Sequence, residues 1–119
     1  MPSEKPSRRL EDIVENVQAI QRYVAGMDLK GFKEDQKTYD AVERCRERIS
    51  EAASKLGEWA PLFIPDQPWH NIRALGNRLR HEYDAIGEDR LGDIVQVDLP
   101  TLCAACEKAL TELGGEPIT

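Results

Sequence analysis

The stretch of sequence best equipped for chemistry is "IRALGNRLRHEYDAI", residues 72–86. Arg73, Asn77 and His81 follow one another at four-residue steps, so a helix would line them along one polar ridge. No Asp or Glu occurs from Gln67 through His81, although the net charge of the whole chain is −6. Arginine donates paired hydrogen bonds to phosphate oxygens, and histidine transfers protons near neutral pH. The run therefore predicts a phosphate site beside a proton-transferring group.

Two further arginines, Arg78 and Arg80, belong to the same run. Arg80 comes four residues after Gly76, and helical side chains lean toward the helix N-terminus, so Arg80 is expected to lie over the glycine. Glycine inside a helix costs about 1 kcal/mol relative to alanine, and close packing or room for a neighbour would each explain it. Arg78 is equally compatible with a solvated face that pairs with Glu82 and Asp84.

Two histidines are present, and the distance between them limits what one chain can do. His70 precedes His81 by eleven positions, which is roughly 16 Å along a helix at about 1.5 Å per residue. A reaction that needs both a base and an acid would therefore use a second His81, which a symmetric dimer with this helix at its interface would supply. The alternatives are a surface role for His81 and a core-edge role for Tyr83.

Four apolar stripes at helical spacing predict the elements that hold this run in place. Strand-like alternation and internal repeats are absent from the sequence. The pattern predicts an all-α fold, a four- or five-helix up-down bundle with short connections. The stripes are Leu10, Ile13, Val14, Val17, Ile20 and Val24; Val42, Cys45, Ile49, Ala52, Ala53 and Leu56; Ile72, Leu75, Leu79 and Ile86; and Leu102, Cys106, Ala109, Leu110 and Leu113.

Turn and cap signals predict where these helices begin and end. Ser7 is expected to cap the first helix, and Gly57 is expected to end the second. The segment "GMDLKGFKED", residues 26–35, is expected to be a connector. The segment "APLFIPDQPW", residues 60–69, has three prolines and is expected to be a rigid, largely non-helical crossing.

The remaining helix signals concern the second and the last helix. Residues 43–51, "ERCRERISE", alternate acids and arginines on an outward face, as is typical of solvated helices. Asp98 is expected to cap the last helix, with Pro100 in its first turn. Leu91, Ile94 and Val95 are expected to begin this last helical segment, which starts again at Pro100.

Length and composition favour one domain, because 119 residues suffice for a single modest core. We expect a helical domain over residues 8–113 between tails at 1–7 and 114–119. No apolar run is long enough to cross a membrane and the N-terminus lacks a signal-peptide core, which favours a cytoplasmic protein. The acidic balance argues against a general nucleic-acid coat protein, because such proteins neutralise many phosphates.

The cysteines favour packing over metal binding. Their number is three, which does not describe a disulfide framework and agrees with a reducing compartment. Cys103 and Cys106 have the spacing of half a zinc site, but no second pair follows. Cys106 also falls on a buried stripe, so we expect no metal site.

Five markers occur in order along the chain: "RYVAGM", "FKEDQKTYDAVERC", "ISEAASKL", the Pro68-Trp69 pair before "NIRALGNRLRHEYD", and "DIVQVDLPTL". Through their order and spacing the chain resembles the HepT-like branch of the HEPN domains from about residue 9 to residue 113. The resemblance implies a homodimeric toxin ribonuclease that needs neither metal nor cofactor. It also implies a partner, a minimal nucleotidyltransferase antitoxin.

The signature of that family is R-x-x-x-x-H-x-Y, in which Arg and His are catalytic and Tyr is the target of AMP transfer by the antitoxin. His81 matches the histidine, Tyr83 the tyrosine, and Asn77 the polar residue that commonly follows the arginine. The arginine position itself holds Gly76. The resemblance therefore implies either an active enzyme, in which Arg80 reaches the space of the missing arginine, or a weakened homologue.

An active enzyme would use the run as follows. His81 would carry the proton transfers, while Asn77 would orient the phosphate or the histidine. Arg80 would stabilise negative charge, and Arg73 and Arg78 would bind RNA phosphates beside it. Tyr83 would shape the site and accept the AMP modification. The alternatives are an inactive homologue that binds RNA, a nucleotide or only its partner protein, and a purely structural helical dimer.

Overall fold

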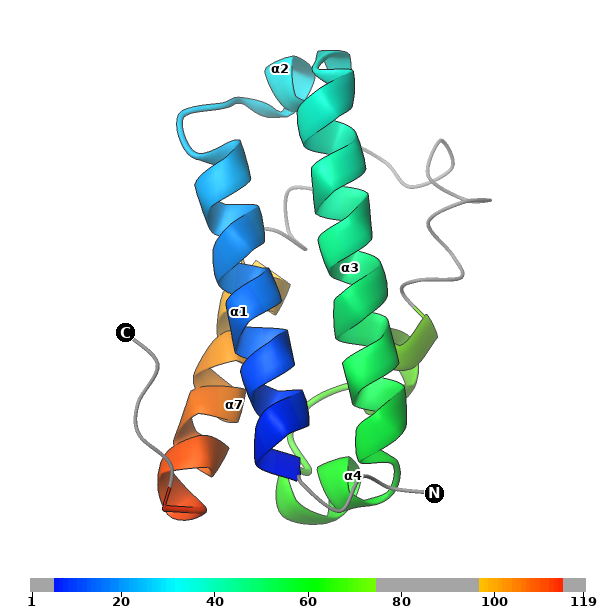
Figure 1. Cartoon of the computed structure of the whole chain (residues 1–119), viewed down its shortest axis with the longest axis vertical. Coiled ribbons are helices and arrows are strands. Elements are labelled where there is room, and N and C mark those ends of the chain that lie inside the picture. The colour runs from blue at the N-terminus through cyan, green and yellow to red at the C-terminus, as the bar shows by residue number, and fades with distance from the viewer. Residues whose placement is uncertain (1–5, 75–96, 115–119) are drawn as a thin grey trace.

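A computed structural model describes residues 6–74 and 97–114, which form helices around one apolar core (Figure 1). These residues contain no strand, and the predicted all-α bundle is confirmed. Residues 69–74, which lead into the arginine-rich run, are also helical. The helices are α1 (Pro6–Val24), α2 (Leu29–Glu34), α3 (Gln36–Leu56), α4 (Trp59–Phe63) and α7 (Leu99–Glu112).

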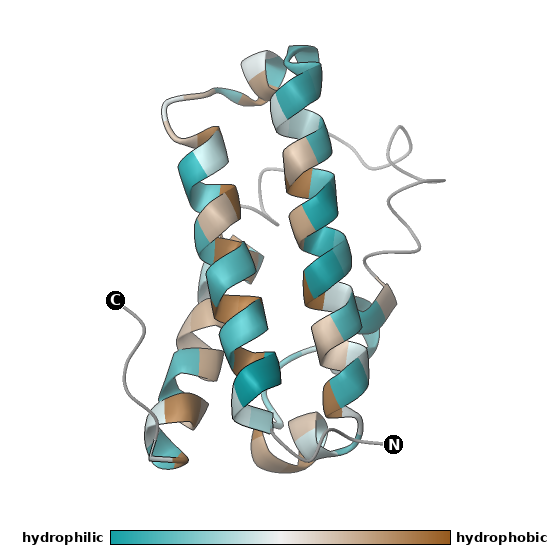
Figure 2. Cartoon of the chain, in the orientation of Figure 1, coloured by the Kyte–Doolittle hydropathy of each residue, from teal (hydrophilic) through white to brown (hydrophobic). Residues whose placement is uncertain are grey.

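The core lies between the two long helices and α7. In Figure 1, α1 and α3 run side by side in opposite directions, and α7 lies next to α1. Apolar and polar residues alternate along these helices with the helical period (Figure 2), so each helix can bury one face and solvate the other. Core positions from the three helices include Leu10, Ile13, Val17, Ile20, Val42, Ile49, Leu56, Leu102, Cys106 and Leu110, each at most 2% exposed.

The predicted stripes are confirmed for α1, α3 and most of α7. Val24 is only partly buried, because it is the last residue of α1. Leu113 was predicted on the last stripe but is 49% exposed, because α7 ends one residue earlier at Glu112. Burial of apolar surface at about 25 cal/mol per Å² is the main term that holds these helices together.

The connector between α1 and α3 contains a helix that the stripes did not predict. Asp28 begins this helix, α2, by accepting a hydrogen bond of 2.7 Å from the Gly31 amide. Phe32 is its buried residue and stacks on Tyr39 of α3, with 5.7 Å between the ring centroids. A six-residue helix with one buried side chain is too short to show a periodic stripe.

The proline-rich crossing is partly helical, so the prediction of a largely non-helical segment was wrong for residues 60–63. Pro61 lies in the first turn of α4, where a proline removes no intrahelical hydrogen bond. Trp59 stacks on Phe63, with 5.0 Å between the ring centroids. Trp69 is 4% exposed and its Nε1 donates to the carbonyl of Ile64 at 2.7 Å, which fixes the end of the crossing to the core.

Two of the predicted helix caps were wrong and one end was confirmed. Helix α1 already begins at Pro6, so Ser7 lies inside it. Asp98 has helical backbone angles and makes no capping hydrogen bond through its side chain, although Pro100 does lie in the first turn of α7. Gly57 ends α3 with φ +58°, a region that glycine adopts far more easily than other residues.

Candidate functional site

The predicted site lies mostly outside the described residues. The structure describes Arg73 and the helical residues 69–74 that lead directly to the others. Outside the described ranges are Gly76, Asn77, Arg78, Arg80, His81 and Tyr83. The described part of the site is therefore the helical segment 69–74 together with the residues that it contacts.

The helical residues 69–74, which lead into the run, bury the first residue of the predicted stripe, Ile72. Ile72 is 6% exposed and packs in the same core as Trp69, and its amide donates to the carbonyl of Pro68 at 3.0 Å. His70 and Asn71 are exposed on the other side of the turn. The start of the run is thus anchored through Trp69 and Ile72, and its polar side faces outward.

Arg73 is bound to α3 through both its backbone and its side chain. Its carbonyl accepts a hydrogen bond from the Ser50 hydroxyl. Its Nε donates to the carbonyl of Ala53 at 3.4 Å, and its Nη2 donates to the carbonyl of Gly57. The side chain is half-buried and reaches toward the C-terminal end of α3. These three hydrogen bonds all join the start of the run to one helix.

The end of α3 offers these acceptors for a general reason. The last four carbonyls of an α-helix have no amide partner within the helix and carry the negative end of its dipole. The Gly57 amide donates to the Ser54 carbonyl at 3.1 Å. In a continuing helix that amide would instead have paired with the carbonyl of Ala53. Arg73 supplies a positively charged donor there, an arrangement known to stabilise helix C-termini.

The face of α3 that meets Arg73 is more buried than the sequence predicted. Arg46 is 2% and Ser50 is 8% exposed, so the prediction of a solvated outward face over residues 43–51 was wrong for these two positions. Each directly follows a residue of the apolar stripe, Cys45 or Ile49. If the apolar stripe of this helix is widened to include the residue that follows each of these positions, it predicts that both Arg46 and Ser50 are buried.

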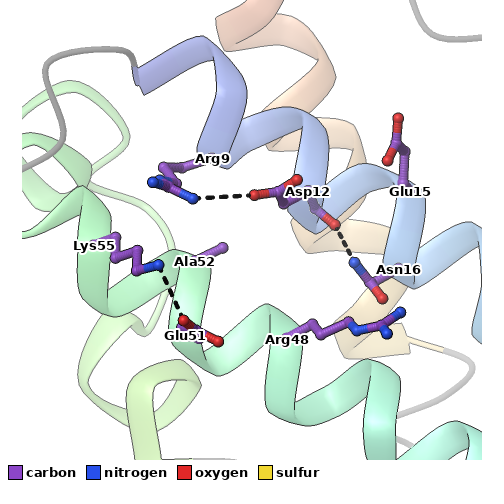
Figure 3. Close-up of a pocket in the computed structure, with 8 residues that line it drawn as sticks. All are labelled: Arg9, Asp12, Glu15, Asn16, Arg48, Glu51, Ala52 and Lys55. Carbon is purple, nitrogen blue, oxygen red and sulfur yellow. Dashed lines mark hydrogen bonds and ion pairs between the residues drawn. The ribbon is translucent and has the colours of Figure 1, made fainter.

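A polar pocket that the sequence did not predict lies between α1 and α3 (Figure 3). Its volume is about 310 Å³. Ion pairs join Arg9 to Asp12 at 3.5 Å and Lys55 to Glu51 at 3.0 Å. The hydrogen bond from Lys55 holds the pKa of Glu51 below its ordinary value. The lining also includes Glu15 and Arg48, so acids and bases are matched in number and the pocket has no cationic excess for a phosphate.

The three cysteines are buried free thiols, as the packing interpretation requires. Burial raises the pKa of Cys103 and of Cys106 to about 12, and Cys103 also donates to a carboxylate oxygen of Glu107 at 3.2 Å. Within residues 6–74 and 97–114, no group of three His, Cys, Asp or Glu side chains could hold a metal ion. The same residues include no helix that is long and apolar enough to cross a membrane.

Comparison with known proteins gives one consistent family. Residues 13–109 match the family described as "Ribonuclease HepT-like". The chain is 32% identical over 116 residues to "Putative RNase MJ0127" of Methanocaldococcus jannaschii, covering 98% of this chain and 96% of that protein. It is 30% identical over 99 residues to "Probable ribonuclease HepT" of Thermococcus cleftensis, covering 83% and 90%. No solved structure matches the chain. The chain belongs to the HepT-like ribonuclease family.

Proposed function

We propose that this protein is the toxin of a toxin–antitoxin pair, a dimeric endoribonuclease that cleaves single-stranded RNA without a metal ion. The observation that carries the proposal is the family match over residues 13–109, which includes the whole arginine-rich run. Within that run, the resemblance matches His81 and Tyr83 to the histidine and tyrosine of the signature, and Asn77 to the polar residue that commonly follows its arginine. The antitoxin would be a minimal nucleotidyltransferase.

The reaction is a transesterification followed by release of a cyclic product. A base takes the proton of the ribose 2′-hydroxyl, the 2′-oxygen attacks phosphorus, and the bond to the 5′-oxygen breaks as an acid protonates that oxygen. The products are a 2′,3′-cyclic phosphate and a 5′-hydroxyl. Histidine suits both proton transfers because an imidazole takes up and releases protons near neutral pH, and His81 is the histidine of the run. Two copies of His81, one from each subunit, would supply the base and the acid.

The other residues of the run would bind and orient the phosphate. Arg80 would stabilise the negative charge that develops on the phosphorane, in place of the arginine that Gly76 replaces. Asn77 would orient the phosphate or the His81 ring, and Arg78 would hold a neighbouring phosphate. Tyr83 would line the site, so transfer of AMP to its hydroxyl by the antitoxin would block access of RNA.

A second candidate function rests on Gly76. Loss of one preorganised phosphate donor commonly removes about 2.7–4 kcal/mol of transition-state stabilisation. If Arg80 does not compensate, the protein would bind RNA, a nucleotide or only its partner, without cleavage. Both candidates use the same surface and the same partner, so only a cleavage assay separates them.

The test is incubation of the purified, partner-free protein with end-labelled single-stranded RNA in EDTA. We expect cleavage with 2′,3′-cyclic phosphate ends, and a loss of at least tenfold in rate for Arg80→Ala. Arg44→Ala is the matched control, because Arg44 is an exposed arginine on α3 that pairs only weakly with Glu47 at 3.2 Å. Absence of cleavage together with retained RNA binding would contradict the enzyme and favour the second candidate.

A further inference from the structure

Arg73 joins the described start of the arginine-rich run to the end of α3. Three hydrogen bonds meet at this residue, one accepted by its carbonyl from Ser50 and two donated by its guanidinium to the carbonyls of Ala53 in α3 and of Gly57 directly after it. The partners lie 16 to 23 positions earlier in the chain, so these contacts are tertiary rather than local. They tie one residue to three successive turns at the end of α3.

Helix α3 is packed into the core where it meets Arg73, so it holds these hydrogen-bond partners in place. Ala53, whose carbonyl accepts a hydrogen bond from Arg73, is 0% exposed. Ile49 and Leu56, which are next in sequence to Ser50 and Gly57, are each at most 1% exposed. Ser50 itself is 8% exposed, so water competes little for its hydroxyl. Because the acceptors are backbone carbonyls, of Ala53 in α3 and of Gly57 directly after it, they cannot turn away as side chains do.

Arg73, where these contacts meet, lies directly before the signature residues in the sequence. Arg73 precedes Asn77 by four positions and His81 by eight positions in the sequence. A catalytic group must be held to about 0.5 Å of its productive position, and a shift of about 1 Å can cost 100-fold in rate. The Ser50 contact on the backbone resists sliding of residues 72–74 along α3, while the guanidinium contacts at Ala53 and Gly57 resist their rotation.

We propose that Ser50 and Arg73 are positioning residues that fix the start of the catalytic run, residues 72–74, against α3, and that Arg73 is not a phosphate ligand. This inference rests on the proposed function. The guanidinium already donates two hydrogen bonds to carbonyls at the end of α3, and its half-buried position holds it there. Two of its five N–H donors thus serve the helix end, and the proposal assigns the RNA phosphates to Arg78 and Arg80.

The first test is steady-state cleavage by Ser50→Ala, beside Ser54→Ala as the matched control. Ser54 lies one turn later on the same helix and is exposed. We expect kcat to fall about tenfold or more for Ser50→Ala with KM within about twofold, and no change for Ser54→Ala. Equal kcat values for the two variants, both folded by circular dichroism, would overturn the proposal.

The second test separates positioning from phosphate binding in Arg73→Met and Arg73→Lys. A positioning role predicts a lower kcat in both, since lysine cannot span two carbonyls with a planar fork, and an unchanged dependence of RNA affinity on salt. A phosphate ligand would instead lower the slope of log affinity against log salt by about 0.7 in Arg73→Met, with lysine restoring it. That second pattern would overturn the proposal.

A third readout does not depend on activity. The His81 ring resonances, recorded by NMR in the partner-free protein, should shift in Ser50→Ala and Arg73→Met and stay in place in Ser54→Ala. If the wild-type protein does not cleave RNA, the proposed ribonuclease function is wrong. The NMR measurement still tests whether Ser50 and Arg73 position the run. Unshifted His81 resonances in both variants would show that Ser50 and Arg73 do not position the run.

Discussion

Arg73 illustrates what residue types and spacing reveal and what they leave out. The sequence predicts a polar ridge of Arg73, Asn77 and His81 and a phosphate-binding role for all the arginines of the run. In the structure, Arg73 also contacts Ser50 and the end of α3, which the sequence does not predict. Those contacts depend on the chain reversing through α4, and no local pattern around Arg73 encodes that reversal.

The buried thiols give a prediction at the same scale. Cys103 and Cys106 have a pKa of about 12 in the folded protein, against the ordinary value of 9.0. Between these values the unfolded chain releases protons that the folded protein keeps, so the free energy of unfolding should fall as pH rises from about 9 to 12. Urea unfolding at several pH values measures this slope.

The control for that prediction is the double variant Cys103→Ala/Cys106→Ala. Lysine and tyrosine also titrate above pH 9, so the informative quantity is the difference between the two proteins. We expect a shallower decline of the unfolding free energy with pH in the double variant. An identical slope in both proteins would contradict the raised pKa values of the two thiols.

At the scale of elements, the long helices follow from the sequence and the short ones do not. The apolar stripes of α1, α3 and α7 are predicted correctly because each buries a face over several turns. Helices α2 and α4 bury one residue each, Phe32 and Ala60, and so leave no periodic signal. The sequence predicts Ser50 on the solvated face, and no nearby residue indicates otherwise. Its acceptor, the Arg73 carbonyl, lies 23 positions away.

The boundary between α2 and α3 supports a stability prediction. Asp35 ends α2 through its backbone and begins α3 by accepting a hydrogen bond from the Thr38 amide at 3.2 Å. Removing such a cap typically costs about 1 kcal/mol. We expect Asp35→Ala to lower the free energy of unfolding by about that amount in urea titrations, and Asp35→Asn to keep most of it.

Asp40→Ala is the matched control for the cap, because Asp40 is an exposed aspartate within α3 whose carboxylate accepts a hydrogen bond from the Gln36 side chain. Its loss should change the unfolding free energy by less than about 0.5 kcal/mol. A loss at Asp40 equal to that at Asp35 would mean that general charge, and not capping, stabilises the start of α3.

At the scale of the whole molecule, net charge limits where the proposed RNA substrate could bind. The net charge of −6 repels RNA overall, so the proposed binding would have to be local. The α1–α3 pocket is matched in charge, and the stretch from Gln67 through His81 lacks acids altogether. A dimer that brings two such stretches together would concentrate positive charge and supply both copies of His81.

The most direct measurement of the central claim is the cleavage rate of the two histidine variants, His81→Ala and His70→Ala, on the same labelled RNA in EDTA. These are the two histidines of the chain, and His70 is exposed on the described turn before the run. General acid–base catalysis by His81 predicts a rate loss of about 100-fold or more for His81→Ala, and a rate within about twofold of wild type for His70→Ala. Equal rates for the two variants would contradict a ribonuclease site built on His81.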